Sequence, residues 1–346
     1  MVSNKTLVFK KVPTGVPVPG EHLVIEDRPI NLDDPAPKGG LVLKVLYASF
    51  DPYLRGKMRD PHIKSYSPAF EINGPIVNST VCKVLKSDAP SFNEGDLVIA
   101  YQPIAEYAVV NNPEEAKVRK INNPHSLDLG LFLGALGMPG LTAWSGLYRI
   151  GKPKKGETIF VSSAAGAVGQ VVGQVSKKEG LRVIGSVGSD EKLDFIINEL
   201  GFDGGFNYKK EKPLEALNRL APEGIDIYFE NVGGEHLEAA LTAMNTDGRI
   251  CACGMISEYN TPLEKRQGVK GLFQIVTKQI LMEGFLVGRP HFGPAYFNEH
   301  QEKMQKWLAD GSVKAKLYVT EGIDNAPEGF IGMLQGKNFG KAVVKI

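Results

Sequence analysis

The chain carries a run of small residues where an apolar stretch meets a stretch of helical composition. Residues 161–174 read VSSAAGAVGQVVGQ and, from Ala164, match the dinucleotide-binding template G-x-G-x-x-G, with Ala in the first position. Gly166 would let the backbone approach a pyrophosphate, whose charge the start of a helix favours. Close packing of helix on strand, through Gly169, is the alternative explanation. Because the match ends one expected strand and begins a helix in a series of such units, we favour dinucleotide binding.

The residues after the next expected strand indicate which dinucleotide binds. An NAD site places a carboxylate there, about 20 residues after the glycines, to bind the ribose 2′-hydroxyl. Here Ser189 has the character of a helix N-cap, and Asp190 and Glu191 belong to the first helical turn. Lys192 then stands where a 2′-phosphate would lie. The sequence therefore favours NADP over NAD.

The elements that position these residues fall into three segments. Residues 1–125 contain short alternating runs between Gly, Pro, Asn and Asp turns, which predicts a β-barrel domain. Residues 126–290 open with a broken helical stretch at 127–151 and then alternate six apolar strands with short helices, which predicts a doubly wound parallel sheet. Residues 291–346 hold a helix and two strand-like runs that are expected to complete the barrel domain. The expected fold is α/β, a Rossmann sheet plus a barrel.

Bulk composition excludes several classes of protein. The 346 residues carry a net charge of +1, so no binding to nucleic acid or to an acidic membrane surface is expected. The first residues lack an apolar signal core, and no apolar run reaches the roughly 18 residues of a membrane span. Three cysteines cannot form a disulfide framework. These features predict a cytoplasmic protein of two domains.

A set of motifs follows in order along the whole chain. It comprises DPYLRG (51–56), GMPGLTAW (137–144), SSAAGAVGQ (162–170), GSDEK (188–192), FNYK (206–209), DIYFENVGG (226–234), CGMISEYN (253–260), GFLV (284–287) and GKNFGK (336–341). Together these motifs resemble the zinc-free medium-chain dehydrogenase/reductases, and more narrowly the alkenal double-bond reductases and prostaglandin reductases of the leukotriene hydroxydehydrogenase type. The resemblance implies a GroES-like barrel, a Rossmann domain, a homodimer, and NADPH-dependent reduction of the carbon–carbon double bond of α,β-unsaturated aldehydes and ketones.

The resemblance also implies roles for individual residues. Tyr53 and Ser79 would line the substrate pocket, and Tyr259 would face both substrate and cofactor. For Tyr53, Asn231 and Asn338, a plain turn is the alternative explanation. The implied cofactor-binding residues are Ala165, Gly166, Ala167, Val168, Gly169, Ser189, Lys192, Tyr208, Asn231, Val232, Cys253, Gly254, Tyr259, Phe285, Leu286, Val287 and Asn338.

The chain departs from these reductases at two places. Ser163 replaces an alanine that usually precedes Gly166, with little expected consequence because serine is also small. Asn78, Ser79 and Thr80 replace a Gly-Tyr-Gly whose tyrosine lines the pocket in many relatives. The preference of those relatives for aromatic substrates is therefore not carried over.

Tyr259 is the expected catalytic residue. Hydride added to the β-carbon of an enone pushes negative charge onto the carbonyl oxygen, and the resulting enolate needs a positioned hydrogen-bond donor. A phenol, with an ordinary pKa of about 10, stays protonated at neutral pH and can donate. Tyr259 lies in the loop that leaves the fifth expected strand, at the ligand-binding edge of such a sheet. The alternative is a tyrosine that only packs against the barrel domain.

No metal site is expected. Cys82 stands alone, Cys251 and Cys253 share one face of an expected buried strand, and the histidines are scattered without a Gly-His-Glu motif. The alkoxide of a simple alcohol would then lack its Lewis acid. Two other functions stay open: a dehydrogenase of hydroxy-fatty-acid or allylic alcohols, and a non-catalytic NADPH-binding protein of the crystallin type.

Overall fold

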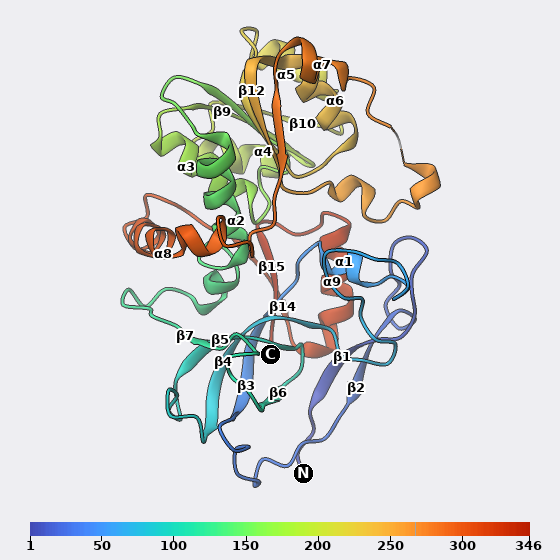
Figure 1. Cartoon of the computed structure of the whole chain (residues 1–346), viewed down its shortest axis with the longest axis vertical. Coiled ribbons are helices and arrows are strands. Elements are labelled where there is room, and N and C mark those ends of the chain that lie inside the picture. Colours follow the sequence, from blue (N-terminus) through green and yellow to red (C-terminus); the bar gives the residue numbers. More distant parts are fainter. Residues whose placement is uncertain (267) are drawn as a thin grey trace. The chain divides into compact units, whose positions relative to one another are not determined.

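The computed structural model describes residues 1–266 and 268–346, which form two compact units (Figure 1). Unit 1 comprises Met1–Leu133 and Leu317–Ile346, and unit 2 comprises Gly134–Lys316. The first boundary therefore falls after Leu133 rather than after residue 125. Over the described residues, no helix is both long enough and apolar enough to cross a membrane.

Unit 2 is built on a parallel sheet. Its six strands, as far as the described residues show, follow the order β10-β9-β8-β11-β12-β13, and every neighbouring pair is parallel. The order runs outward in both directions from the central pair β8 and β11, which is the doubly wound topology expected from the sequence. The strands are β8 (Thr158–Val161), β9 (Arg182–Val187), β10 (Gly204–Asn207), β11 (Ile225–Glu230), β12 (Met244–Ala252) and β13 (Leu281–Gly284).

Helices cover both faces of this sheet (Figure 1). On one face α2 packs against α3 and α8, and on the other α6 packs against α5 and α7. Between α5, α6 and the strands lies a core that includes Phe160, Phe206, Leu217 and Leu237. The helices are α2 (Met138–Gly146), α3 (Gly169–Lys178), α4 (Asp190–Asp194), α5 (Pro213–Leu220), α6 (Gly234–Ala243), α7 (Phe273–Thr277) and α8 (Gly293–Ala309), with shorter turns η2 (Leu147–Gly151), η3 (Phe195–Glu199), η4 (Ile256–Glu258) and η5 (Leu263–Lys265).

The helical stretch expected at 127–151 is divided. A 3-10 turn, η1 (Leu129–Leu133), comes first, then α2, then the π-type turn η2. Gly137 is extended and Pro139 lies in the first turn of α2, where its missing N–H costs nothing. A side chain at Gly140 would place its Cβ 1.8 Å from a backbone carbonyl oxygen, so only glycine fits there.

Unit 1 is a β structure. Among the described residues it holds a two-stranded sheet, β1-β2, and a seven-stranded sheet along β14-β15-β3-β4-β5-β7, with β6 paired to β3. The last two strands of the chain therefore join strands from its first part, as expected for a GroES-like barrel domain. The strands are β1 (Lys5–Phe9), β2 (Leu23–Asp27), β3 (Leu41–Ser49), β4 (Val77–Ser87), β5 (Leu97–Pro103), β6 (Tyr107–Val110), β7 (Arg119–Lys120), β14 (Leu317–Glu321) and β15 (Lys341–Lys345).

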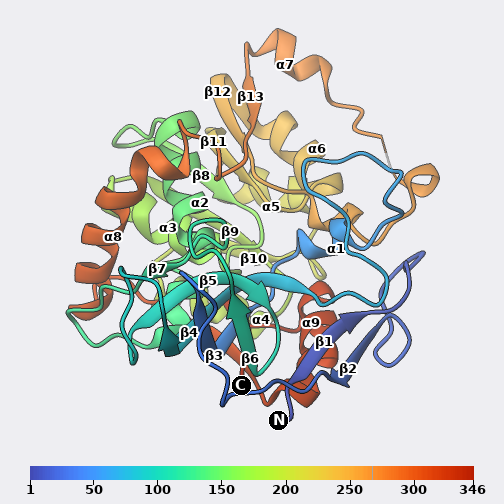
Figure 2. The ribbon, with the colours of Figure 1, turned by 60° about the horizontal axis from the view of Figure 1, so that its bottom comes forward.

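Two helices accompany these strands: α1 (Leu54–Lys57) and α9 (Ala326–Leu334), which follows the short turn η6 (Ile323–Asn325). Helix α9 connects the parallel strands β14 and β15 and lies beside β1 and β2 (Figure 2). Its Phe330 meets Phe50 edge-on at 5.8 Å between ring centroids, in a core that also contains Phe9 and Leu23. This core supports the loop that follows β3.

The return to unit 1 begins later than expected. The sequence pattern groups 291–346 with the barrel, whereas α8 and the residues up to Lys316 belong to unit 2. The reason is a pair of glutamines on α3. The side chain of Gln174 accepts from the backbone N–H of Lys314 at 2.8 Å, and that of Gln170 accepts from Lys316 at 2.9 Å. These bonds hold the segment after α8 against α3.

Candidate active site

The candidate cofactor-binding residues of unit 2 gather at one edge of its sheet. Because the strands are parallel, their carboxyl ends meet there, and the loop after each strand contributes residues. The central strands β8 and β11 are followed by helices on opposite faces, so the edge opens between their loops, where ligands bind in sheets of this kind. All the implied cofactor residues except Asn338, which belongs to unit 1, lie after one of these six strands.

The loop between β8 and α3 is as tightly built as the glycine pattern predicts. Ser163 has a positive φ of 52°, an uncommon conformation for a residue with a side chain. A Cβ at Gly169 would lie 2.4 Å from the Ser163 carbonyl oxygen, so glycine is required there for packing. Within the described loop, Val168 at the start of α3 makes no side-chain cap. The N–H groups of Gln170 and Val171 donate to the carbonyl oxygens of Gly166 and Val168, each at 3.0 Å, and the start of the helix favours an anion through its dipole.

Glu230, at the end of β11, organises the next loop. Its Oε1 accepts from the backbone N–H of Val232 at 2.6 Å and of Gly233 at 2.8 Å, and from the Tyr228 hydroxyl at 2.8 Å. Burial raises the pKa of this carboxyl group, and the two N–H groups oppose that shift. Sequence reasoning missed Glu230, whose only signal is an acid at the last position of a largely buried strand.

Asn231 ties the loops of the two central strands together. Its backbone N–H donates to Ser162 Oγ at 2.9 Å, and its side-chain amide donates to the Ser162 carbonyl oxygen at 2.8 Å. The amide of Asn231 thus has a structural partner in the loop after β8. The carbonyl of Glu230 also accepts from Cys253 and Gly254, at 3.0 and 3.1 Å, which adds the loop after β12.

Positive charge collects at the ends of β9 and β10. Ser189 caps α4 by accepting from the backbone N–H of Lys192 at 3.2 Å, as the sequence predicts. Burial lowers the pKa of Lys192, and the neighbouring cation Lys209 lowers it further. A Cβ at Gly188 would lie 3.0 Å from the Tyr208 hydroxyl, so this phenol stands beside the same turn. Sequence reasoning missed Lys209 as a member of this group, although it ends the motif FNYK.

The two acids after β9 behave as helix residues. Asp190 accepts from Asn207 at 2.9 Å and pairs with Lys210, and these partners lower its pKa. Glu191 is exposed in the first turn of α4. Asp190 is therefore held by β10 and its loop, and the expectation that both acids serve the helix is consistent with this geometry.

Tyr259 lies over the end of β12. It directly follows the turn η4, and a Cβ at Gly254 would lie 2.9 Å from its hydroxyl oxygen. Cys253 stands just beyond the strand in which it was expected.

After β13, Phe285 stacks on Phe292 at 5.0 Å and meets Phe229 edge-on at 6.3 Å. Leu286 and Val287 continue the same loop, and Leu286 is partly exposed.

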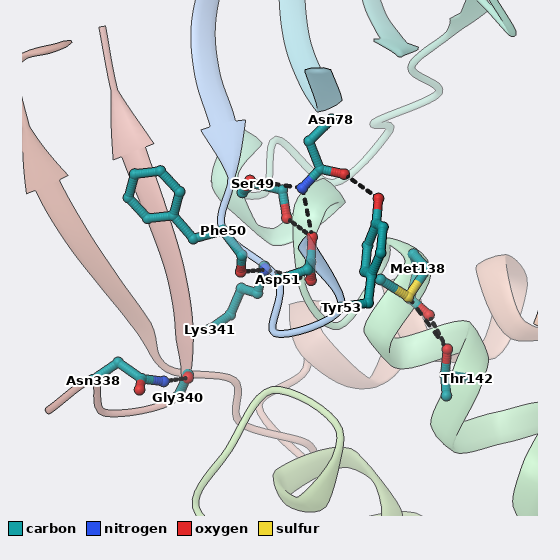
Figure 3. Close-up of polar contacts among 10 residues, drawn as sticks. All are labelled: Ser49, Phe50, Asp51, Tyr53, Asn78, Met138, Thr142, Asn338, Gly340 and Lys341. Atoms are coloured by element: carbon teal, nitrogen blue, oxygen red, sulfur yellow. Dashed lines mark hydrogen bonds and ion pairs between the residues drawn. The ribbon is translucent and has the colours of Figure 1, made fainter. Parts of the chain in front are cut away.

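Unit 1 contributes a buried polar cluster around Asp51 (Figure 3). Lys341 Nζ lies 2.8 Å from Asp51 Oδ1, and the two side chains are 1% and 4% exposed. Burial lowers the pKa of Lys341, and Asp51 opposes that shift. Burial, Asp51 and Tyr101 all raise the pKa of the Tyr53 hydroxyl well above its ordinary value.

Ser79 and Asn338 are the remaining candidate residues of unit 1. Ser79 pairs with Tyr101 across β4 and β5 and is half-buried. Asn338 donates its amide to the Gly340 carbonyl at 2.7 Å, which is the turn role given above as its alternative (Figure 3). Sequence reasoning missed Tyr101, which lies in no quoted motif, and Lys341, which ends the motif GKNFGK.

The described residues contain no group of three or more His, Cys, Asp or Glu side chains arranged to hold a metal ion. Cys82 and Cys251 are buried, and burial raises the pKa of both thiols.

Comparisons with known proteins place the chain in a family. A family model described as the N-terminal domain of oxidoreductase matches residues 5–118, and one described as zinc-binding dehydrogenase matches residues 167–307. The NADP-dependent oxidoreductase RED1 of Cochliobolus heterostrophus is 51% identical over all of this chain and 98% of its own length. The chain belongs to the medium-chain dehydrogenase/reductases. The resemblance found from its motifs is thereby confirmed.

Two further members of this family are similar over nearly their whole length. The 2-alkenal reductase (NADP(+)-dependent) of Nicotiana tabacum is 44% identical over all of this chain and 98% of its own. The crystal structure of CurA from Vibrio vulnificus in complex with NADPH has a TM-score of 0.90 and 37% identity, covering 99% of this chain and 98% of the other. The Rossmann and GroES-like architecture of these dehydrogenase/reductases therefore extends to this chain.

Glu230 gives a testable prediction for this member of the family. Its folded-state pKa is raised, so its contribution to the free energy of unfolding is greatest below the unfolded-state pKa of about 4.3 and is lost as pH rises through the folded-state pKa. Glu230→Gln keeps the acceptor oxygen and removes the charge. We expect the stability of the Gln variant, relative to the unmodified chain, to rise with pH in urea unfolding experiments.

Glu230→Ala is the matched comparison. It leaves the N–H groups of Val232 and Gly233 without their acceptor, which should cost about 1–3 kcal/mol at every pH. A Gln variant whose stability runs parallel to that of the unmodified chain across pH 5–9 would show that Glu230 does not titrate as its burial implies.

Proposed function

We propose that this chain reduces the carbon–carbon double bond of α,β-unsaturated aldehydes and ketones with NADPH. The chain is an NADP-dependent oxidoreductase, like the relatives described above. The observation that carries the finer proposal is Tyr259, whose hydroxyl lies beside Gly254 at the ligand-binding edge of the sheet. Its setting supports a hydrogen-bond donor to an enolate oxygen. The full-length similarity to a 2-alkenal reductase supports the substrate class.

The edge of unit 2 has the features that NADP(H) requires. Residues 165–169 form a loop without bulk at the start of α3, which suits the pyrophosphate. Ser189, Lys192 and Tyr208, joined by Lys209, would hold the 2′-phosphate. An anion there would oppose the effects of burial and of the neighbouring Lys209 cation, which together lower the pKa of Lys192. The further residues assigned to the cofactor are Asn231, Val232, Cys253, Gly254, Phe285, Leu286 and Val287 in unit 2 and Asn338 in unit 1.

Lys192 tests this assignment. A charged hydrogen bond to phosphate contributes about 1.5–3 kcal/mol, or roughly 10–150-fold in affinity. Lys192→Ala should raise the KM for NADPH within that range and leave the KM for NADH nearly unchanged. Lys154→Ala is the control, because this exposed lysine precedes β8 at the opposite edge of the sheet. Equal loss with both cofactors would place Lys192 outside the phosphate site.

The proposed reaction needs one donor from the protein. When bound, NADPH supplies a hydride. The β-carbon of the substrate gains this electron pair, the π electrons of the double bond move toward the carbonyl, and an enolate forms. Tyr259 donates a hydrogen bond to the enolate oxygen, and the α-carbon then takes a proton from solvent. The products are the saturated carbonyl compound and the oxidised cofactor.

A substrate panel tests the function. With NADPH, 2-alkenals and enones should yield saturated aldehydes and ketones, identified by mass spectrometry, and Tyr259→Phe should lower kcat by about 10²–10³-fold with NADPH binding retained. Tyr148→Phe is the control, since its hydroxyl donates to Glu179, the C-cap of α3 at the end far from the glycine loop.

Each other outcome points to a different function. Oxidation of allylic or hydroxy-fatty-acid alcohols with NADP⁺, but no reduction of alkenals, would make the chain a dehydrogenase. NADPH binding without turnover of any member of the panel would make it a binding protein. A Tyr259→Phe variant with most of its kcat would mean that Tyr259 only shapes the pocket.

We also propose that the chain forms a homodimer through the β13 edge. In the described part of the sheet, β13 pairs only with β12, so its other edge offers backbone N–H and C=O groups. Helix α7, shortly before β13, exposes 72% of Phe273 and 69% of Val276. Two copies related by a twofold axis could pair their β13 strands and cover these side chains.

Charge on α7 tests the dimer. Phe273→Glu with Val276→Glu should raise the dimer dissociation constant roughly tenfold or more, because a carboxylate in an apolar interface must be desolvated. Sedimentation velocity across a concentration series measures it. Ile63→Glu, an exposed apolar position of unit 1, is the control. An unmodified chain that sediments as a monomer at every concentration contradicts the proposal.

A further inference from the structure

The amide of Asn78 in β4 is bonded on both sides (Figure 3). Its Oδ1 accepts from the Tyr53 hydroxyl at 2.6 Å. Its Nδ2 donates to the Ser49 carbonyl oxygen at 2.8 Å and to Asp51 Oδ2 at 2.9 Å. Asn78 is 1% exposed, so water does not compete for these bonds.

The partners of Nδ2 decide which way the amide faces. If the amide were turned over, its oxygen would meet a carbonyl and a carboxylate, with no proton between the three acceptors. Asp51 is held as an acceptor by Lys341 Nζ at 2.8 Å and by Ser49 Oγ at 2.5 Å. The oxygen of Asn78 therefore faces Tyr53. A phenol has one proton, and here that proton is given to Asn78.

Tyr101 is a further neighbour of Tyr53. The Tyr101 hydroxyl accepts from Lys57 Nζ at 3.0 Å. Burial, Asp51 and the hydrogen bond with Tyr101 all raise the pKa of Tyr53. Tyr53 is therefore protonated at neutral pH, and its hydroxyl has a proton to give to Asn78.

We propose that Asn78 is a positioning residue that takes the proton of Tyr53 and holds its ring as a wall of the substrate pocket. Tyr53 then cannot donate to a substrate oxygen. The place of Tyr53 in a substrate pocket rests on the proposed function, whereas the direction of its hydrogen bond does not.

Raman spectroscopy tests the direction without turnover. The intensity ratio of the tyrosine Fermi doublet depends on whether the phenol donates or accepts, and the difference between the unmodified chain and Tyr53→Phe isolates Tyr53. We expect a donor signature. The signature should be lost when the same difference is taken in an Asn78→Ala background. Asn78→Gly serves as a second variant if Asn78→Ala folds poorly.

Thr80→Val is the matched control. Thr80 lies two residues further along the same buried face of β4, and its hydroxyl donates to the Ala100 carbonyl at 3.0 Å. The donor signature should persist in this variant. An acceptor-only signature in the unmodified chain, or a donor signature that survives the loss of Asn78, overturns the proposal.

Kinetics give a second, independent reading. With an enal that the enzyme reduces, Tyr53→Phe should change KM and should not lower kcat by the roughly 10²-fold that follows loss of an oxyanion donor. Asn78→Gly should raise KM, and this increase should vanish in the Tyr53→Phe background, as required of a residue that acts through Tyr53. A fall in kcat of about 10²-fold in Tyr53→Phe would overturn the proposal. If the unmodified enzyme reduces no enal or enone, the proposed function fails, and the Raman result still decides the role of Asn78.

Discussion

The parallel direction of the six described strands of unit 2 is the constraint on which its functional edge depends. The parallel direction brings the carboxyl ends of all six strands to one side of the sheet. The loops that follow the strands there have no sheet hydrogen bonds to hold them. Glu230 supplies much of what holds them. Its carboxylate takes two N–H groups of its own loop, and its carbonyl takes the N–H groups of Cys253 and Gly254. Ser162 extends these contacts to β8 through Asn231.

A comparable arrangement supports the loop after β3 in unit 1. There a buried carboxylate, Asp51, is satisfied by the Lys341 ammonium, the Ser49 hydroxyl and the Asn78 amide. A buried charge is tolerated when both oxygens have such partners, as they do at Asp51. Glu230 is bonded through Oε1, and its buried Oε2 has no hydrogen-bond partner among the described residues. In each cluster the bonds define a loop conformation that apolar packing alone would not specify, because each bond has a required direction and length.

Local sequence patterns predicted most of the fold. The βα series, the glycine loop and the Ser189 cap depend on neighbours within a few residues, and all three appear as expected. The boundary after α8 was not predicted correctly. Two glutamines on α3 hold the segment that follows α8, and glutamine has no strong positional preference that would indicate this. Lys209 and Tyr101 were missed because their neighbours Lys192 and Lys57 are distant in the sequence, and a single sequence does not show which segments meet. Glu230 was missed although its partners Tyr228, Val232 and Gly233 are close in the sequence, because an acid at the end of a strand has no pattern that indicates these bonds.

Asn78 shows what a motif comparison leaves out. By resemblance alone, Tyr53 and Tyr259 are equivalent phenols, each expected to face a substrate. The role of Tyr53 depends on a neighbour outside its motif, because its hydroxyl donates to the amide oxygen of Asn78. A hydrogen bond has a direction, and the direction is set by the whole set of partners around the acceptor. Under the proposal, one residue of the adjacent strand β4 therefore decides the chemical role of Tyr53.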